Sequence, residues 1–147
     1  MNEAAVESVI PATVDSSGSV IEVRNLRKSF GDHVVLREFN LSLKEEETLA
    51  VLGKSGSGKS VLIKCIVGLI PPDAGEIRVL GKSVPDLEAE ELDFLRRDLG
   101  FLFQWGALYD SMTVRENLIF PLRKHGDKTR QQIADKVEEV LESVGLP

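Results

Sequence analysis

The feature that most constrains the fold of this chain is the segment 53–60, which reads Gly-Lys-Ser-Gly-Ser-Gly-Lys-Ser. It matches the pattern G-x-x-x-x-G-K-[ST] and lies between the apolar run 48–52 and a helical pattern over 60–70. Its glycines let the backbone curl so that successive N–H groups point into one concavity, and the helix that follows adds the positive end of its dipole. A loop of this kind between a buried strand and a helix is typical of the P-loop of α/β folds.

The residue types of this segment predict a site for a nucleoside triphosphate. Lys59 would place its ammonium against the β and γ phosphates, and the Ser60 hydroxyl is a suitable oxygen ligand for Mg2+. Backbone N–H groups would form the rest of the cradle, and they come from Gly53, Lys54, Ser55, Gly56, Ser57 and Gly58. We therefore expect the whole segment to bind phosphate and Lys59 to serve the reaction as well.

Ahead of the loop, the sequence predicts antiparallel sheet. The segments 20–23 and 39–43 have strand patterns, and Gly31–Asp32 is a turn signal between them. The run 48–52 is almost continuously apolar and is the candidate central strand of a parallel sheet. Residues 1–19 carry acidic but no basic residues and a Ser/Gly stretch, so we expect a disordered tail there.

Beyond the loop, strands are expected over 76–80 and 99–103. Between them, Asp86 would cap a helix that runs to about Arg97. The single cysteine, Cys65, has apolar neighbours and is expected to be a small buried residue rather than a reactive thiol.

The last third of the chain predicts two helices. The segments 113–116 and 129–132 each have the spacing of a capping box, which satisfies the first N–H groups of a helix. Pro121 should end the first helix and Gly145 the second. Apolar residues at helical spacing over 133–144 predict a face that packs on a core.

Composition excludes several classes of protein. Lys and Arg number 18 against 24 Asp and Glu, a net charge of -6, which is not the basic surplus of a nucleic-acid-binding protein. The longest apolar run, 61–70, is about half the roughly 20 residues that cross a bilayer. The N-terminus has no basic segment followed by an apolar one, so we expect no secretory signal and a cytoplasmic location.

With these elements in order, residues 20–147 resemble the nucleotide-binding subunits of ATP-binding cassette (ABC) transporters. The segment 21–31 resembles the family's first strand, with Phe30 at the position of the aromatic residue that stacks on adenine, where tyrosine is commoner. The segment 99–104 resembles the strand that leads into the Q-loop. Gln104 would be the glutamine that reaches the Mg2+ ion and the attacking water and couples the site to the membrane partner.

The resemblance implies an α/β fold: a RecA-like P-loop core with an N-terminal antiparallel β-subdomain and, from about residue 105, the start of a helical subdomain. It implies an ATPase with ATP and Mg2+ as cofactors, Lys59 and Gln104 as catalytic residues, and Ser60 and Gln104 as metal ligands. A membrane permease and a second copy of the subunit would be partners, at the cytoplasmic face of the inner membrane.

The resemblance also implies what this stretch lacks. The signature motif, the Walker B acid, the catalytic glutamate and the switch histidine do not occur by Pro147. We therefore expect a truncated unit that binds Mg-ATP without turning it over. Within the family, 103–118 with 120–123 most resembles the branch serving MCE-type lipid transporters. That branch implies a phospholipid cargo and an MCE-type lipid-binding partner.

Two alternatives stay open on the sequence alone. A P-loop kinase uses the same loop, although such kinases usually begin with the P-loop strand, whereas sheet-like segments precede it here. A non-catalytic nucleotide-binding module needs nothing beyond 53–60. Asp110 follows the string 106–109 as a Walker B acid would, but that string is too weakly apolar to favour a Mg2+ ligand there.

Overall fold

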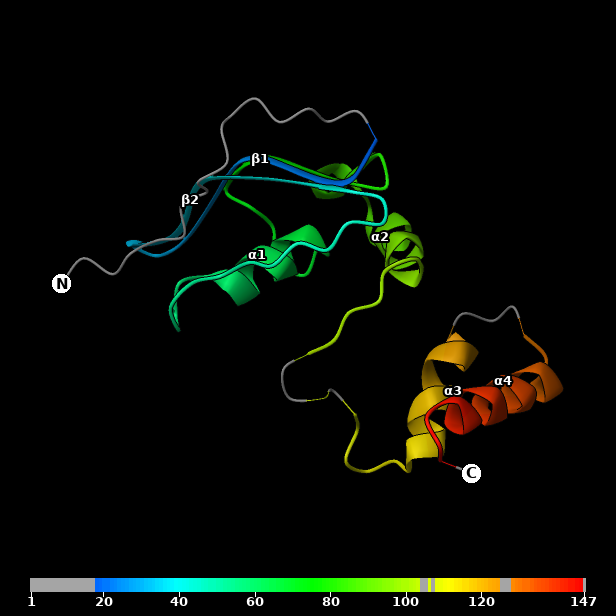
Figure 1. Cartoon of the computed structure of the whole chain (residues 1–147). Helices are drawn as coiled ribbons and strands as arrows, with labels where there is room; N and C mark the ends of the chain where they lie inside the picture. The colour runs from blue at the N-terminus through cyan, green and yellow to red at the C-terminus, as the bar shows by residue number, and fades with distance from the viewer. Residues whose placement is uncertain (1–17, 104–105, 107, 125–127, 147) are drawn as a thin grey trace. The chain divides into compact units, whose positions relative to one another are not determined.

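The computed structural model forms two compact units, residues 1–100 and residues 101–147. In the first unit, four strands form one antiparallel sheet in the order β2 (His33–Lys44), β1 (Ser19–Phe30), β3 (Ala74–Val79) and β4 (Lys82–Ser83), of which Figure 1 labels β1 and β2. The predicted tail at 1–19 lies outside the described residues except for its last two positions. The structure describes residues 18–103, 106, 108–124 and 128–146.

β1 (Ser19–Phe30) and β2 (His33–Lys44) form a hairpin of two 12-residue strands. The predicted turn at Gly31–Asp32 is confirmed, since it joins Phe30 to its register partner His33. Both strands are longer than the predicted 20–23 and 39–43 because their pairing continues through four register shifts.

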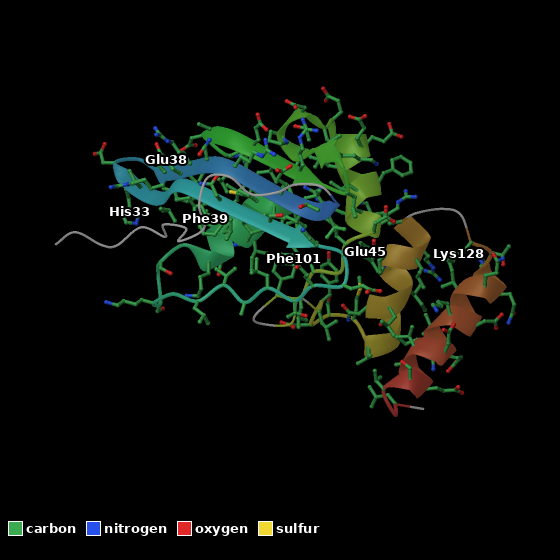
Figure 2. All side chains as sticks on the ribbon, turned by 45° about the horizontal axis from the view of Figure 1, so that its top comes forward. His33, Glu38, Phe39, Glu45, Phe101 and Lys128 are labelled. Carbon is green, nitrogen blue, oxygen red and sulfur yellow. The ribbon has the colours of Figure 1, made fainter. Side chains whose placement is uncertain are left out.

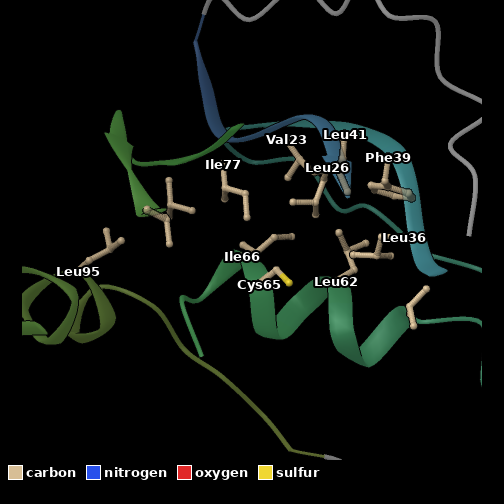
Figure 3. Packing of buried hydrophobic residues seen from close by; sticks show 13 residues of the cluster. Val23, Leu26, Leu36, Phe39, Leu41, Leu62, Cys65, Ile66, Ile77 and Leu95 are labelled. Atoms are coloured by element: carbon tan, nitrogen blue, oxygen red, sulfur yellow. The ribbon is translucent and has the colours of Figure 1, made fainter. Parts of the chain in front are cut away.

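The helix that follows the glycine-rich loop, α1 (Lys59–Ile66), lies against one face of this sheet. Figure 3 shows Leu62, Cys65 and Ile66 directed toward the strand residues of the core. Cys65 is fully buried, as predicted, and burial raises the pKa of its thiol. The core of the first unit comprises Val23, Leu26, Val35, Leu36, Phe39, Leu41, Leu62, Cys65, Ile66, Ile77, Val79, Val84 and Leu95.

The prediction that this helix runs to Ile70 is wrong, because Gly68 ends it earlier. Gly68 adopts the left-handed conformation (φ 70°), and its N–H donates to the Cys65 carbonyl (3.0 Å) while the Leu69 N–H donates to the Lys64 carbonyl (2.8 Å). This pair of bonds is the Schellman motif, which closes a helix. The Arg96 guanidinium also donates to the Gly68 carbonyl (2.8 Å) and supports the helix end.

The next elements are β3 (Ala74–Val79), β4 (Lys82–Ser83), the short 3-10 helix η1 (Val84–Asp86) and α2 (Ala89–Arg97). β3 confirms the strand predicted over 76–80. Asp86 is not the cap of α2: it ends η1 and accepts a hydrogen bond from Ser83 Oγ (2.5 Å). Glu88 takes the cap position instead, because it forms a reciprocal capping box with Glu91.

Two predicted strands do not form among the described residues. The run 48–52 is extended but unpaired, with Leu52 87% exposed, so the prediction of a buried central strand is wrong for this structure. In 99–103 only Phe103 makes a bridge, to Gly106, and Leu102 is 89% exposed. A parallel strand requires neighbouring strands, and no strand in the described part of the chain pairs with either segment.

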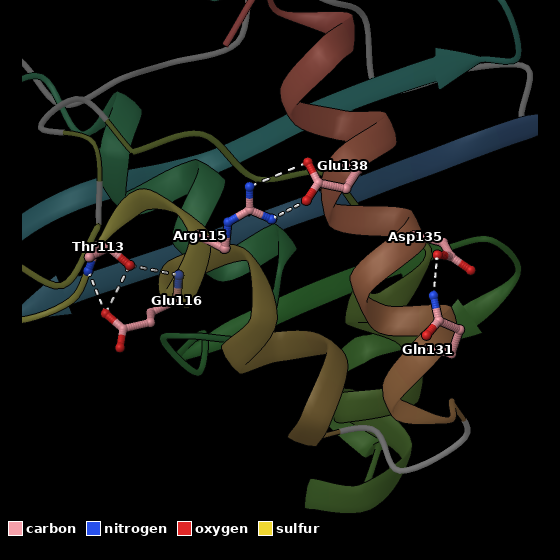
Figure 4. A network of polar contacts seen from close by, with 6 residues as sticks. All are labelled: Thr113, Arg115, Glu116, Gln131, Asp135 and Glu138. Atoms are coloured by element: carbon pink, nitrogen blue, oxygen red, sulfur yellow. Dashed lines mark hydrogen bonds and ion pairs between the residues drawn. The ribbon is translucent and has the colours of Figure 1, made fainter. Parts of the chain in front are cut away.

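The second unit is a pair of helices, α3 (Val114–Lys124) and α4 (Arg130–Ser143). Both predicted capping boxes are confirmed: the Thr113 N–H donates to Glu116 Oε2 (2.7 Å), and the Thr129 N–H donates to Gln132 Oε1 (2.8 Å). The Arg115 guanidinium donates to Glu138 Oε1 (2.6 Å) and links the two helices (Figure 4). The predicted stop at Gly145 is also confirmed, since this residue has φ 72° and donates to Glu142.

The prediction that Pro121 ends α3 is wrong. Proline removes one helical hydrogen bond, but α3 continues to Lys124 because its apolar residues on both sides of Pro121 pack on α4. Leu118, Ile119 and Leu122 contact the cluster Ile133, Val137 and Leu141. None of the helices in the described ranges has both the length and the apolar character of a membrane span.

Candidate nucleotide-binding site

The loop 53–58 leads from the extended run 48–52 into the first turn of α1. Its Ser57 N–H donates to the Lys54 carbonyl (3.2 Å), which forms a turn, and Gly58 is the N-cap residue of the helix. The first helical bond joins the Leu62 N–H to the Gly58 carbonyl (2.9 Å). Gly58 has no side chain to cap the helix, and no acidic residue stands in the first turn. The positive end of α1 is therefore available to an anion.

Gly58 also brings this loop against the hairpin. It has φ 101°, and a Cβ atom at this position would lie 2.6 Å from Val35 Cγ1 and 3.2 Å from the Val35 carbonyl oxygen. Any other residue would push the loop away from β2. Val35 stands two residues after His33, which is about 6.6 Å along a strand. The loop therefore lies close to the hairpin turn that follows Phe30. Figure 2 shows His33 at this end of the hairpin.

The Lys59 side chain folds back across the loop. Its Nζ atom donates to the Gly53 carbonyl (2.7 Å) and to the Lys54 carbonyl (2.8 Å). These bonds bring the two ends of the segment together and place a positive charge over its backbone. Because a neutral carbonyl is a weaker partner for an ammonium than an anion is, these contacts can be exchanged for an anionic ligand.

Ser57 is a partly buried residue of the loop. Its Oγ atom is buried and, among the described residues, has no hydrogen-bond partner. A Cβ atom at position 53 would lie 2.6 Å from this Oγ, so a larger residue there would force the Ser57 hydroxyl to rotate. A buried hydroxyl without a partner costs about 1–3 kcal/mol. The loop thus holds a polar group that its own backbone does not satisfy.

Phe30 stands at the end of β1 with 49% of its surface exposed. The Lys28 ammonium lies 5.4 Å from the centroid of its ring. Asp73, which follows α1, accepts from Lys28 Nζ (2.7 Å) and from the Ser29 N–H (2.6 Å), and these bonds lower the pKa of its carboxyl. The sequence does not indicate this role of Asp73, because its partners lie about 45 residues earlier in the chain.

The structure places the predicted residues 53–58 in a loop and Lys59 and Ser60 at the start of α1, all within the same unit as Phe30. Ser60 is exposed in the first turn of α1. Gln104 lies outside the described residues. Asp110 belongs to the second unit.

The second unit carries a groove of its own on α3, with a volume of about 410 Å³. Ile119 and Phe120 form its apolar wall, and Phe120 contacts Tyr109 edge to face at 5.4 Å between ring centroids. Glu116 and Arg123 give the groove one charge of each sign, and Met112 completes the lining. A groove of this chemistry suits an amphipathic segment of another protein.

This chain resembles known proteins in sequence and in fold. A model of the ABC transporter family matches residues 36–147. "Probable ribonucleotide transport ATP-binding protein mkl" of Mycobacterium leprae is 42% identical over 88% of this chain and 37% of its own length. The methionine import ATP-binding protein MetN of Clostridium tetani is 40% identical over 86% of this chain and 40% of its own. The Arabidopsis thaliana protein trigalactosyldiacylglycerol 3, chloroplastic, is 38% identical over 90% and 38%.

This chain therefore spans about two fifths of the length of these relatives. Among solved structures, a dimeric ATP-binding cassette in a post-hydrolysis state with ADP and Pi aligns with a TM-score of 0.72 at 32% identity, over 83% of this chain and 56% of that one. The protein cbiO1 of Clostridium perfringens, part of the ABC transporter complex cbiONQ, aligns with a TM-score of 0.73 at 26% identity, over 88% and 51%.

These neighbours confirm the predicted fold class, an α/β P-loop NTPase portion in which an antiparallel sheet precedes helices. The family match covers the phosphate loop, residues 36–100 of the first unit and the whole second unit, and it does not favour the P-loop kinase. This chain belongs to the ABC transporter family.

Proposed function

We propose that this chain provides the P-loop side of an ATP site in the ATP-binding subunit of an ABC transporter. The observation that carries the proposal is the geometry of 53–60. A curled loop, an uncapped helix N-terminus and the Lys59 ammonium converge there, in a chain of the ABC transporter family. Together they suit the charge and shape of a triphosphate.

Different residues at the loop and at the start of α1 bind different parts of Mg-ATP. Lys59 exchanges the carbonyls of Gly53 and Lys54 for phosphate oxygens, and the N–H groups at the start of α1 donate to the same phosphates. The exposed Ser60 hydroxyl holds Mg2+, which neutralises phosphate charge when bound. Gln104 is the second proposed ligand, on the resemblance alone, since it lies outside the described residues.

Phe30 is the proposed stacking partner of the adenine base. Two observations support this role: its ring is half exposed, and the hairpin that carries it contacts Gly58 of the loop through Val35. An aromatic face that stacks on a base contributes about 1–3 kcal/mol. The hairpin thus supplies the base side of the site and α1 the phosphate side.

Replacing Lys59 by alanine tests the proposal. Lys59→Ala removes the charged contact to the phosphates, and we expect an affinity loss of about 1.5–3 kcal/mol for a fluorescent ATP analogue with Mg2+. Lys64→Ala is the matched control, because it removes the same charge from the same helix at the opposite end from the loop. Equal affinities for wild type and Lys59→Ala would refute the proposal, whereas a loss in Lys59→Ala alone supports it.

Phosphate release by wild type and by Lys59→Ala tests whether this chain hydrolyses ATP. Hydrolysis needs a Mg2+ ion held by an acid and a positioned water, and the described residues contain no group of three or more His, Cys, Asp or Glu side chains arranged to hold a metal ion. We expect chain 1–147 to bind nucleotide without releasing phosphate faster than Lys59→Ala does. Turnover above that control would show that another residue of this chain completes the site.

The whole subunit, in this proposal, hydrolyses ATP as a dimer and drives a membrane permease. The groove on α3 is the proposed docking place for an amphipathic segment of the permease, because it offers an apolar wall and the charges of Glu116 and Arg123. This docking would hold the protein at the cytoplasmic face of the membrane. Co-purification with a co-expressed permease, lost in Phe120→Asp and kept in Lys136→Asp, tests it.

The finer proposal concerns the cargo. The string at 106–109 and the segment 120–123 favour the branch that moves phospholipid with an MCE-type lipid-binding partner. One relative bears the name of a lipid, trigalactosyldiacylglycerol, while two others are named for ribonucleotide and methionine transport. Stimulation of ATPase activity in the reconstituted transporter by phospholipid, but not by methionine or ribonucleotides, would support this branch.

A further inference from the structure

Asp73, in the segment between α1 and β3, contacts the end of β1 at three points. Asp73 accepts from Lys28 Nζ through Oδ1 (2.7 Å) and from the Ser29 N–H through Oδ2 (2.6 Å). Its own N–H donates to the Arg27 carbonyl (2.9 Å). A single exposed ion pair fixes little, but these contacts engage three successive residues of the strand, two of them through the backbone. Asp73 therefore fixes the course of β1 immediately before Phe30.

The contact with Lys28 reaches the Phe30 ring itself. The Lys28 side chain is only 12% exposed, so its ammonium is held in place. It lies 5.4 Å from the ring centroid, within the range of a cation–π contact. Because Phe30 is still 49% exposed, the ring has free surface on which a flat ligand can stack. Asp73 thus sets both the backbone and the neighbouring charge of this aromatic residue.

Asp73 also helps to fix the position of Phe30 relative to the phosphate loop. At the start of α1, Gly58 contacts β2 at Val35. Beyond the other end of the same helix, Asp73 contacts β1 at residues 27–29. The helix that presents the loop is therefore tied to the hairpin on both sides. Such a double attachment fixes the spacing between a base on Phe30 and phosphates on the loop.

We infer that Asp73 is a positioning residue for the adenine base, acting through residues 27–29 and the Lys28 ammonium on the ring of Phe30. This inference rests on the proposed function, because it assumes a nucleotide on the P-loop. It adds a residue outside the loop. It predicts that replacing Asp73 weakens the binding of the base and leaves the binding of the phosphates unchanged.

A double-mutant cycle with two ligands tests the inference. We would measure dissociation constants of a fluorescent ATP analogue and of inorganic tripolyphosphate, each with Mg2+, for wild type, Asp73→Ala, Phe30→Ala and the double variant. Asp73→Ala should weaken the ATP analogue about fivefold, the lower end of the range for a stacked base, and change tripolyphosphate less than about twofold. In the Phe30→Ala background, Asp73→Ala should cause no further loss.

Two more variants separate positioning from folding. Asp73→Asn keeps an acceptor for the Ser29 N–H but loses the ion pair with Lys28, so it should show the same selective loss in a protein that folds. Glu22→Gln breaks the ion pair with Arg24 on the same strand and should leave both affinities unchanged.

Equal losses for both ligands, or an undiminished effect in the Phe30→Ala background, would overturn the inference and make Asp73 a purely structural residue. So would unchanged affinities in both Asp73 variants while Lys59→Ala still weakens binding, and in that case the proposed function stands. A wild-type protein that binds neither ligand would overturn both.

Discussion

The two compact units differ in what holds them together. The first packs a four-stranded sheet against α1 and α2 through thirteen of the described residues, all of them buried. In the second, the buried residues Ile133, Val137 and Leu141 all come from α4, and α3 contributes only partly buried side chains. The second unit relies to a larger extent on its capping boxes and on the Arg115–Glu138 pair. A helix of 11 or 14 residues is marginal without tertiary packing, so we expect the second unit to open first.

A matched pair of leucine truncations would show the largest difference. Leu62 is 1% exposed between α1 and the sheet, and Leu62→Ala should cost about 2–5 kcal/mol in the first unit. Leu141→Ala, at 6% exposure in a thin core, should cost about 2 kcal/mol or less because the site can collapse. Hydrogen exchange resolved by unit would measure both. Loss of protection in the first unit on Leu141→Ala would contradict the division between the units.

Two glycines of the phosphate loop give a smaller and sharper contrast within the first unit. Gly58→Ala should cost about 1–3 kcal/mol, because φ is positive and the new Cβ would meet Val35. Gly56 also has positive φ (79°) but nothing within 4 Å, so Gly56→Ala should cost only about 1 kcal/mol. Thermal unfolding would rank the two. The reverse order would show that the loop does not pack on β2.

The smallest effect concerns acid stability of the second unit. The Arg115 guanidinium lowers the pKa of Glu138 in the folded state, so the unfolded chain binds this proton more readily. The stabilisation is present above the ordinary carboxylate pKa and is lost as pH falls through the lowered pKa. Glu138→Gln should make α3–α4 stability less sensitive to pH below about 5, relative to wild type, by circular dichroism. An unchanged acid profile would show that the pair contributes nothing.

The parts of the fold that the sequence could predict are those determined by residues close together in the sequence. The Gly31–Asp32 turn, the capping boxes at 113–116 and 129–132, and the helix stop at Gly145 depend on a few consecutive residues, and all are confirmed. The pattern of 53–60 is local in the same sense: its first six residues form a loop, and Lys59 and Ser60 begin α1.

The parts that could not be predicted depend on tertiary neighbours. Pro121 stays inside α3 because Leu122, beyond it, packs on α4. The apolar run 48–52 predicts a buried strand, but its pattern does not indicate which strands would pair with it. In this structure the run is unpaired. Asp73 contacts residues about 45 positions earlier, and no spacing rule reaches that far.

The central claim is that 53–60 binds the phosphates of Mg-ATP, and hydrogen exchange with and without saturating Mg-ATP tests it most directly. At 100 times the dissociation constant, ligand stabilises the unit that binds it by up to about 2.7 kcal/mol. We expect added protection at the loop, α1 and the β1–β2 hairpin in wild type, little of it in Lys59→Ala, and none in α3 or α4. No added protection in wild type, or equal protection in Lys59→Ala, would contradict it.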